Sequence, residues 1–216
     1  MYDYVLFDLD GTISDSSEGI TKGIQIALKA VGIEEERDNL RKFIGPPLTY
    51  SFKEFYGFDE ETTNIAIKKY REYYAVTGLY ENVAYDGIEA LLKKIKDSGR
   101  KIAVATSKPE AFSKNILEKF GLLKYFDYVA GATLPTDSGK KRGEKQEVVE
   151  YAIELFGNPD KSKVVLIGDT MFDAKGAKAV GIDCIGVLYG FGSEKSLLES
   201  GAKYIAETIE DIYQYL

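Results

Sequence analysis

From residue 87 onward, the sequence alternates between helical and extended patterns of hydrophobic residues. The predicted helices are 88–95, 109–120, 144–156, 172–180 and 209–216, and the predicted strands are 101–106, 128–130, 164–167, 182–187 and 203–206. Strands that alternate with helices are joined by crossovers, and crossovers place neighbouring strands parallel with helices on the faces of the sheet. The pattern therefore predicts an α/β fold with a doubly wound, Rossmann-like parallel sheet.

Residues 16–82 interrupt this alternation. Amphipathic helical patterns follow one another there, around 20–31, 38–43, 47–56 and 60–76, without a convincing strand. A chain of 216 residues is long enough for one core with a modest insertion. We therefore predict a core formed by residues 1–15 and 83–216, with a helical domain inserted at 16–82.

Two aspartates stand at the end of the first predicted strand. The apolar run Tyr4-Val5-Leu6-Phe7 is followed by Asp8-Leu9-Asp10-Gly11-Thr12. Positions two apart in an extended chain point to the same side, and open α/β sheets bind ligands beyond the carboxyl ends of their strands. Two close carboxylates are costly unless a cation lies between them or one is protonated. The pair indicates a magnesium site, a nucleophile with an acid/base partner, or both; a hydrated turn is the simpler alternative.

Three further segments place polar side chains at strand ends or at the start of a helix. The hydroxyls and ammonium of Thr106-Ser107-Lys108 precede a helix whose amino end can bind an anion, although a simple helix cap explains them equally well. Asp169 ends a strand four residues before Asp173, and Lys145 begins a helix, where a lysine needs a nearby anion. Each segment alone also fits ordinary surface structure, but together they indicate one site along the sheet edge.

Composition excludes several other chemistries. The chain contains no histidine, so phosphohistidine chemistry, Ser-His-Asp triads and imidazole zinc sites are absent. Its single cysteine, Cys184, cannot form an internal disulfide. A net charge of −7 argues against a nucleic-acid partner, and the absence of an 18-residue apolar run argues against a membrane partner. A cytoplasmic protein is expected.

These motifs together resemble those of the haloacid dehalogenase-like hydrolase superfamily, in its phosphoglycolate phosphatase-like branch with a helical C1 cap. The resemblance extends over essentially the whole chain. Its motifs are Asp8-Leu9-Asp10-Gly11-Thr12, Thr106-Ser107-Lys108-Pro109, Lys145, Gly168-Asp169-Thr170-Met171-Phe172-Asp173 and the insert segment Gly45-Pro46-Pro47-Leu48.

The resemblance implies a role for each of these residues. Asp8 would attack phosphorus, and Asp10 would protonate the leaving oxygen and then deprotonate the attacking water. Thr106 and Lys145 would hold the transferred phosphoryl group, although Lys140 and Lys141 compete with Lys145 for that role. The implied phosphate- or substrate-binding residues are Gly11, Ser107 and Lys108, and the implied Mg²⁺ ligands are Asp8, Asp10 through its backbone carbonyl, Asp169 and Asp173. Asp173 would act through a water molecule or, alternatively, anchor Lys145.

The implied activity is hydrolysis of small phosphomonoesters by a Mg²⁺-dependent phosphatase, with phosphoglycolate, a nucleotide or pyrophosphate as candidate substrates. The partner is then a small phosphorylated metabolite, and the protein is expected to be a monomer or a homodimer. A phosphomutase of the beta-phosphoglucomutase type is the enzymatic alternative, because it uses the same core residues. A protein that binds a phosphorylated metabolite without catalysis is the alternative from another class.

Overall fold

The computed structural model describes residues 1–134, 137–138 and 140–216. The chain forms two compact units, one made of residues 1–14 and 84–216 and the other of residues 15–83. The predicted division was 1–15 with 83–216, and 16–82. The first unit contains the sheet and the second is helical, so each is described separately. Among the described residues, no helix is both long and apolar enough to span a membrane.

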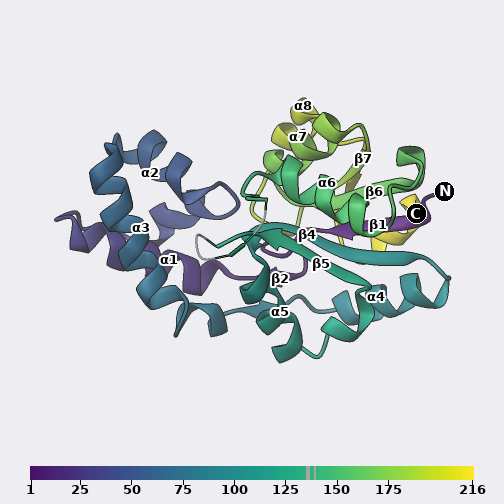
Figure 1. The fold of residues 1–216 in the computed structure, drawn as a ribbon, viewed down its shortest axis with the longest axis horizontal. Helices are drawn as coiled ribbons and strands as arrows, with labels where there is room; N and C mark the ends of the chain where they lie inside the picture. The colour runs from purple at the N-terminus through teal and green to yellow at the C-terminus, as the bar shows by residue number, and fades with distance from the viewer. Residues whose placement is uncertain (135–136, 139) are drawn as a thin grey trace. The chain divides into compact units, whose positions relative to one another are not determined.

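The first unit is built on a six-stranded sheet whose order is β5-β4-β1-β6-β7-β8, with every neighbouring pair parallel. The strands are β1 (Tyr4–Phe7), β4 (Lys101–Pro109), β5 (Tyr128–Ala132), β6 (Val164–Gly168), β7 (Asp183–Val187) and β8 (Tyr204–Ala206). Helices cover both faces, with α6, α7 and α8 on one side and α4 and α5 on the other (Figure 1). These helices are α4 (Ile88–Asp97), α5 (Glu110–Lys119), α6 (Lys145–Leu155), α7 (Met171–Val180) and α8 (Glu194–Ser200). The α/β class and the parallel, doubly wound sheet predicted from the sequence are confirmed.

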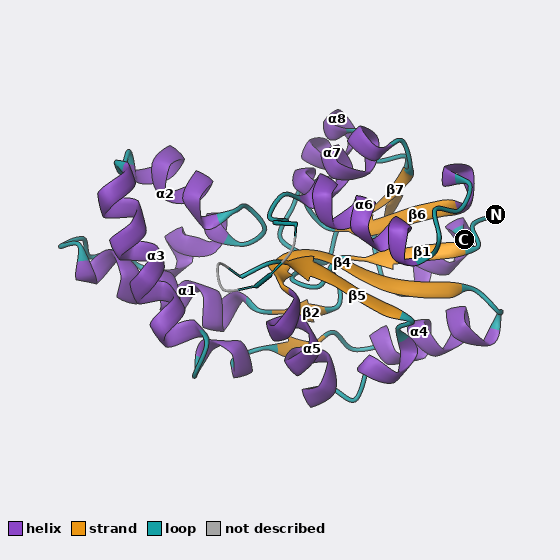
Figure 2. Cartoon of the chain, in the orientation of Figure 1, coloured by secondary structure: helices purple, strands orange, loops and turns teal. Residues whose placement is uncertain are grey.

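The central strand β1 decides where a ligand can bind. Val5, Leu6 and Phe7 are completely buried, because helices pack on both faces of a parallel sheet. Strands β4 and β5 lie on one side of β1 and strands β6 and β7 on the other (Figure 2), and β8 follows β7 in the sheet. Strand order reverses at β1, and open α/β sheets bind ligands at the carboxyl ends around such a reversal.

The end of the chain differs from the prediction. The sequence predicted a helix at 209–216, whereas the structure has a short 3₁₀ helix, Glu210–Tyr215. Backbone bonds there join residues three apart, as from the Ile212 amide to the Ile209 carbonyl. A segment of six residues is too short for an extended i→i−4 ladder, and single turns commonly tighten into the 3₁₀ form. Shorter 3₁₀ turns also occur at Leu123–Tyr125 and Lys161–Lys163.

The second unit is a small bundle of helices. Its elements are α1 (Ser17–Ala30), a 3₁₀ helix (Arg37–Phe43), α2 (Leu48–Tyr56), α3 (Glu60–Tyr74) and a 3₁₀ turn (Gly78–Tyr80). Helix α1 packs on α3, where Gly23 leaves room for the Tyr70 ring: an added Cβ would lie 2.9 Å from it. The Phe52 ring lies 5.1 Å from Phe43 and 5.7 Å from Phe58, so aromatic contacts form much of this core. Short strands β2 (Ser14–Asp15) and β3 (Val83–Ala84) pair where the chain passes between the units.

We expect Gly131→Ala to destabilise the first unit. Gly131 pairs with Thr106 in the sheet, and a Cβ there would lie 2.5 Å from the Glu110 Cα and 2.8 Å from the Lys108 carbonyl oxygen. Because these are backbone atoms, the clash cannot be relieved by a rotamer change, and overpacking of this kind costs about 1–3 kcal/mol. Urea unfolding of the variant measures the loss.

Gly143→Ala is the matched control, since an added Cβ there has no neighbour within 4 Å. Its free energy of unfolding should stay within about 0.5 kcal/mol of wild type. Equal midpoints for the two variants would show that the backbone contact at Gly131 does not constrain the fold.

Candidate active site

The polar residues predicted at strand ends lie in one region of the first unit. Asp8 and Asp10 directly follow β1, and Asp169 directly follows β6, the neighbouring strand. On the other side of β1, strand β4 carries Thr106, Ser107 and Lys108 near its carboxyl end. The first residue of α6 contributes an ammonium group to the same region. This is the edge of the sheet at which strand order reverses.

Lys145 extends inward from the start of α6. Its ammonium nitrogen lies 2.8 Å from Asp8 Oδ1 and 2.7 Å from Asp173 Oδ1, and it donates a hydrogen bond of 3.1 Å to the Ala105 carbonyl. Helix α7 makes room for the lysine stem, because a Cβ at Gly176 would lie 2.6 Å from Lys145 Cγ. Only 7% of Lys145 is exposed. The lysine therefore joins the first aspartate of β1 to one on α7.

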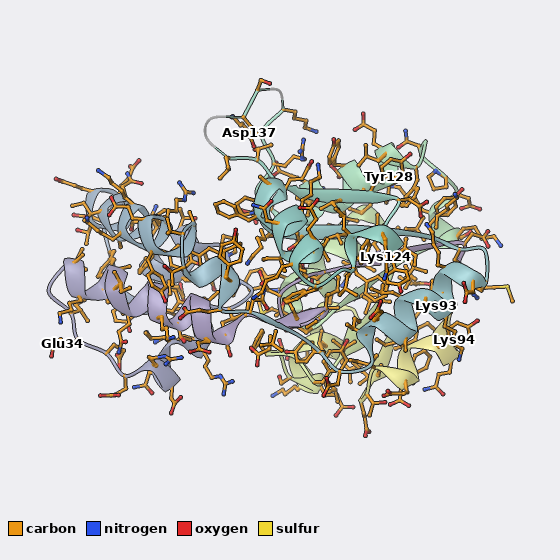
Figure 3. The ribbon with its side chains drawn as sticks, turned by 90° about the horizontal axis from the view of Figure 1, so that it is seen from below. Glu34, Lys93, Lys94, Lys124, Tyr128 and Asp137 are labelled. Carbon is orange, nitrogen blue, oxygen red and sulfur yellow. The ribbon has the colours of Figure 1, made fainter. Side chains whose placement is uncertain are left out.

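The two competing lysines lie elsewhere. Lys140 is exposed, and Lys141 is exposed and donates to the backbone carbonyls of Leu134 and Asp137. Asp137 belongs to the loop between β5 and α6 and is labelled in Figure 3. Of the three candidate lysines, Lys145 is the one that contacts Asp8 in the structure.

Three carboxylates form a buried group that can hold a metal ion. One oxygen from each of Asp8, Asp169 and Asp173 lies within 4.8 Å of the other two. Asp173 also receives hydrogen bonds at Oδ2, from the Thr170 amide at 2.9 Å and its hydroxyl at 2.8 Å. Its two oxygens therefore both have protein partners, one of which is Lys145. The side chain of Asp10 lies outside this carboxylate group, so it could contribute to a metal site only through its backbone carbonyl.

Burial and mutual repulsion strongly affect these acids. The pKa of Asp8 is raised to about 6, because burial, together with the charge of Asp173, outweighs the attraction of Lys145. Burial also raises the pKa of Asp169 well above its usual range, and the charges of Asp173 and Asp8 add to this. For Lys145, the attraction of Asp173 and Asp8 outweighs the cost of burying the ammonium and raises its pKa. The site therefore has more buried negative charge than its lysine neutralises, which favours binding of a further cation.

Asp169 is held by residues for which no such role was predicted. The Phe191 amide donates to Asp169 Oδ2 at 2.8 Å, and the Thr12 hydroxyl donates to Oδ1 at 3.3 Å. A Cβ at Gly190 would lie 2.4 Å from Asp169 Cβ, and one at Gly11 would lie 2.1 Å from Asp169 Oδ2. Gly11, predicted to bind phosphate, also adopts a φ of +81° that glycine readily tolerates. In the sequence, the two glycines flanking Phe191 indicate a turn, but they do not indicate that this turn contacts Asp169.

The segment after β4 contains both a hydroxyl and a cation. Thr106 is 2% exposed, and its Oγ1 accepts a hydrogen bond of 3.2 Å from the Lys108 amide. The Lys108 ammonium contacts Asp10, 2.7 Å from Oδ2 and 3.0 Å from Oδ1. Ser107 is half-buried. Each aspartate that follows β1 is thus paired with a different lysine.

The chain is similar to proteins of known class over most of its length. A family model described as "Haloacid dehalogenase-like hydrolase" matches residues 5–187. A 5'-nucleotidase of Pseudomonas aeruginosa is 43% identical over 197 residues, covering 91% of this chain and 87% of that protein. A protein of Mycobacterium tuberculosis named tyrosine-protein kinase PtkA is 34% identical over 215 residues, and the match covers 98% of this chain and 72% of that protein.

Solved structures show the same fold. A crystal structure described as a "predicted phosphatase" from Clostridium acetobutylicum is 46% identical, with a TM-score of 0.93. The match covers all of this chain and 98% of the other. Phosphoglycolate phosphatases are also among the relatives, which agrees with the resemblance found in the motifs. The chain therefore belongs to the haloacid dehalogenase-like hydrolase family, in the branch that includes phosphoglycolate phosphatases, and is a phosphatase.

Proposed function

We propose that this phosphatase hydrolyses small phosphomonoesters with the help of Mg²⁺ and through an aspartyl-phosphate on Asp8. The observation that carries the proposal is the position of Asp8. This carboxylate ends the central strand, contacts the Lys145 ammonium at 2.8 Å and lies within the buried carboxylate group. Phosphoryl transfer requires mainly a positioned nucleophile and neutralisation of charge on the phosphoryl oxygens.

The reaction has two steps, and both Asp8 and Asp10 take part in each of them. In the first step, an Asp8 oxygen forms a bond to phosphorus, the bond from phosphorus to the ester oxygen breaks, and Asp10 gives a proton to the leaving oxygen. In the second step, Asp10 takes a proton from water, whose oxygen attacks the same phosphorus. The bond from phosphorus to Asp8 then breaks, which releases phosphate and restores the Asp8 carboxylate.

The lysine and the threonine hold the transferred group. The Lys145 ammonium is positioned beside Asp8 by Asp173 and by the Ala105 carbonyl, so its positive charge lies next to the phosphoryl oxygens during transfer. The buried hydroxyl of Thr106 is the second donor in this role. Asp173 acts as the anchor of Lys145, because each of its oxygens has a protein partner.

The residues present fit a hard divalent cation. Asp8 and Asp169 would supply carboxylate oxygens to such an ion, and the backbone carbonyl of Asp10 would be a third ligand, which suits the oxygen preference of Mg²⁺. Burial and the charges of Asp173 and Asp8 raise the pKa of Asp169, and a bound cation would favour its carboxylate form. When bound, the ion would neutralise charge on the phosphoryl oxygens.

The name of one relative suggests a substrate class for this chain. The 43% identical protein from Pseudomonas aeruginosa is named a 5'-nucleotidase, which supports nucleoside 5′-monophosphates as substrates of this chain. We propose that the helical unit, which includes the Gly45-Pro46-Pro47-Leu48 segment, is a cap domain of the C1 type. Phosphoglycolate and pyrophosphate are the comparison substrates.

We expect the wild type with Mg²⁺ to hydrolyse AMP with a higher kcat/KM than phosphoglycolate or pyrophosphate. Asp8→Asn should reduce release of phosphate from every substrate to the detection limit, because an amide cannot act as the nucleophile. EDTA should abolish wild-type turnover. Malachite-green detection of phosphate measures all three effects.

Two results would reject this account: metal-independent turnover by the wild type, or unchanged turnover by Asp8→Asn. ATP with a tyrosine peptide belongs in the same panel, since one relative is named a tyrosine-protein kinase. Transfer of phosphate to the peptide in preference to water would replace hydrolysis as the proposed reaction.

Lys145→Met should lower kcat by about 10²-fold or more, because the ammonium stabilises charge that develops during transfer. Lys140→Met and Lys141→Met are the matched controls, since both lysines are exposed. Both controls should keep wild-type kcat. Steady-state kinetics with 4-nitrophenyl phosphate compares the three variants, and a loss confined to Lys140→Met or Lys141→Met would reassign the role.

Asp169→Asn should raise the thermal midpoint of the metal-free protein. The pKa of Asp169 is raised in the fold, so ionisation of this carboxyl at neutral pH opposes folding. The loss of stability begins as pH rises above the pKa that Asp169 has in the unfolded chain. Removing the charge should add about 2 °C or more for a chain of this size. Mg²⁺ should raise the wild-type midpoint but not that of the variant.

Differential scanning fluorimetry with and without Mg²⁺ measures both midpoints. Asp97→Asn removes an exposed carboxylate from α4 and is the control for a change in net charge. A Mg²⁺-induced shift of equal size in wild type and Asp169→Asn would contradict the proposed metal ligand.

A further inference from the structure

Lys108 makes a close, two-pronged contact with Asp10. Its ammonium lies 2.7 Å from one carboxylate oxygen and 3.0 Å from the other. The lysine side chain is 5% exposed and that of the aspartate 13%, so the pair is largely shielded from solvent. Charge-assisted hydrogen bonds of this length are strong, and contact with both oxygens restricts rotation of the carboxylate.

The backbone around Lys108 is shaped for this contact. In the pairing of β4 with β5, the register shifts between Thr106, which faces Gly131, and Pro109, which faces Ala132, so Ser107 and Lys108 lie at an irregularity of β4. Such a bulge re-aims a side chain and is common next to active sites. The Lys108 amide donates to Thr106 Oγ1, which fixes the bulged segment.

The two lysines of the site therefore serve different aspartates. Lys145 contacts Asp8, and Lys108 contacts Asp10. A Lys108 that bound the substrate phosphate as its main partner would have to leave Asp10 without this ion pair. Removing one partner of a buried pair is costly, because the other charge remains uncompensated. The contact thus favours a role for Lys108 through Asp10.

We propose that Lys108 is a positioning residue that orients the Asp10 carboxyl for proton transfer to the leaving oxygen. This inference rests on the proposed function. In the step concerned, the bond from Asp8 to phosphorus forms, the ester bond from phosphorus to oxygen breaks, and the proton of Asp10 passes to the departing oxygen. When Asp10 is protonated, the Lys108 ammonium donates to the oxygen that does not carry the proton. Lys108 itself neither gains nor loses a proton, and it fixes the direction in which Asp10 presents its own.

The test compares esters whose leaving groups differ in their need for a proton. 4-Nitrophenyl phosphate releases 4-nitrophenolate, which departs readily without protonation. The leaving groups of phenyl phosphate and of glycerol phosphate need a proton to an increasing degree. Lys108→Met should lower kcat/KM about 10²-fold more for glycerol phosphate than for 4-nitrophenyl phosphate, because the range of a general acid is lost only where the leaving group needs a proton. Values of kcat/KM are the correct measure because they report the steps up to departure of the leaving group.

A double-mutant cycle with Asp10→Asn links the effect to its partner. With glycerol phosphate, Lys108→Met should cost little more in an Asp10→Asn background, because the carboxylate that it orients is gone. Lys108→Arg keeps a cation able to contact both oxygens and should recover part of the loss. Lys114→Met removes an exposed lysine of α5 and is the control for the lost charge, with unchanged kinetics expected.

The outcomes separate this inference from the function on which it rests. An equal loss for all three esters would overturn the positioning role and favour direct binding of the transferred phosphoryl group. Additive losses in the double-mutant cycle would overturn it as well. A wild type without Mg²⁺-dependent turnover of any ester would instead overturn the proposed function. A misfolded Lys108→Met would also lose activity equally on every ester, so its thermal midpoint is compared with that of wild type. Where the midpoint is lowered, the comparison of esters is made with Lys108→Arg instead.

Discussion

The structure of the proposed active site depends on one buried ammonium group. Lys145 lies between Asp8 and Asp173, at 2.8 and 2.7 Å, in a region that also contains Asp169. Without this cation, three buried carboxylates would repel one another across a few ångströms in a poorly screened environment. The lysine reduces that repulsion but does not cancel it, which explains why the pKa values of Asp8 and Asp169 remain raised.

The sheet and its glycines create the space for this charge arrangement. Strand β1 lies between β4 and β6, so the residues after these three strands converge from separate parts of the chain. Gly11 and Gly190 allow the backbone to approach the Asp169 carboxylate, and Gly176 leaves room for the stem of Lys145. In each case an added Cβ would lie 2.6 Å or less from these side chains. Much of the active site is thus positioned by residues without side chains.

The sequence predicted the fold well where hydrophobic periodicity was regular. Strands at 101–106 and 164–167 were expected and occur at Lys101–Pro109 and Val164–Gly168. The prediction was wrong for the last helix, because periodicity does not distinguish a regular helix from a short 3₁₀ segment. The supporting role of Gly190-Phe191-Gly192 was also missed: it arises from a contact with Asp169, which is 22 residues from Phe191 in sequence.

The sequence by itself determined the family and the order of its motifs, because acids, hydroxyls and lysines at strand ends are visible in the local pattern. Tertiary structure alone decided which lysine contacts which aspartate. Lys140, Lys141 and Lys145 lie within six residues of one another, and only packing of α6 on α7 turns Lys145 toward Asp8. Likewise, the bulge in β4 brings Lys108 to Asp10. Such pairings depend on distances between segments far apart in the chain, and these distances are set by packing rather than by local pattern.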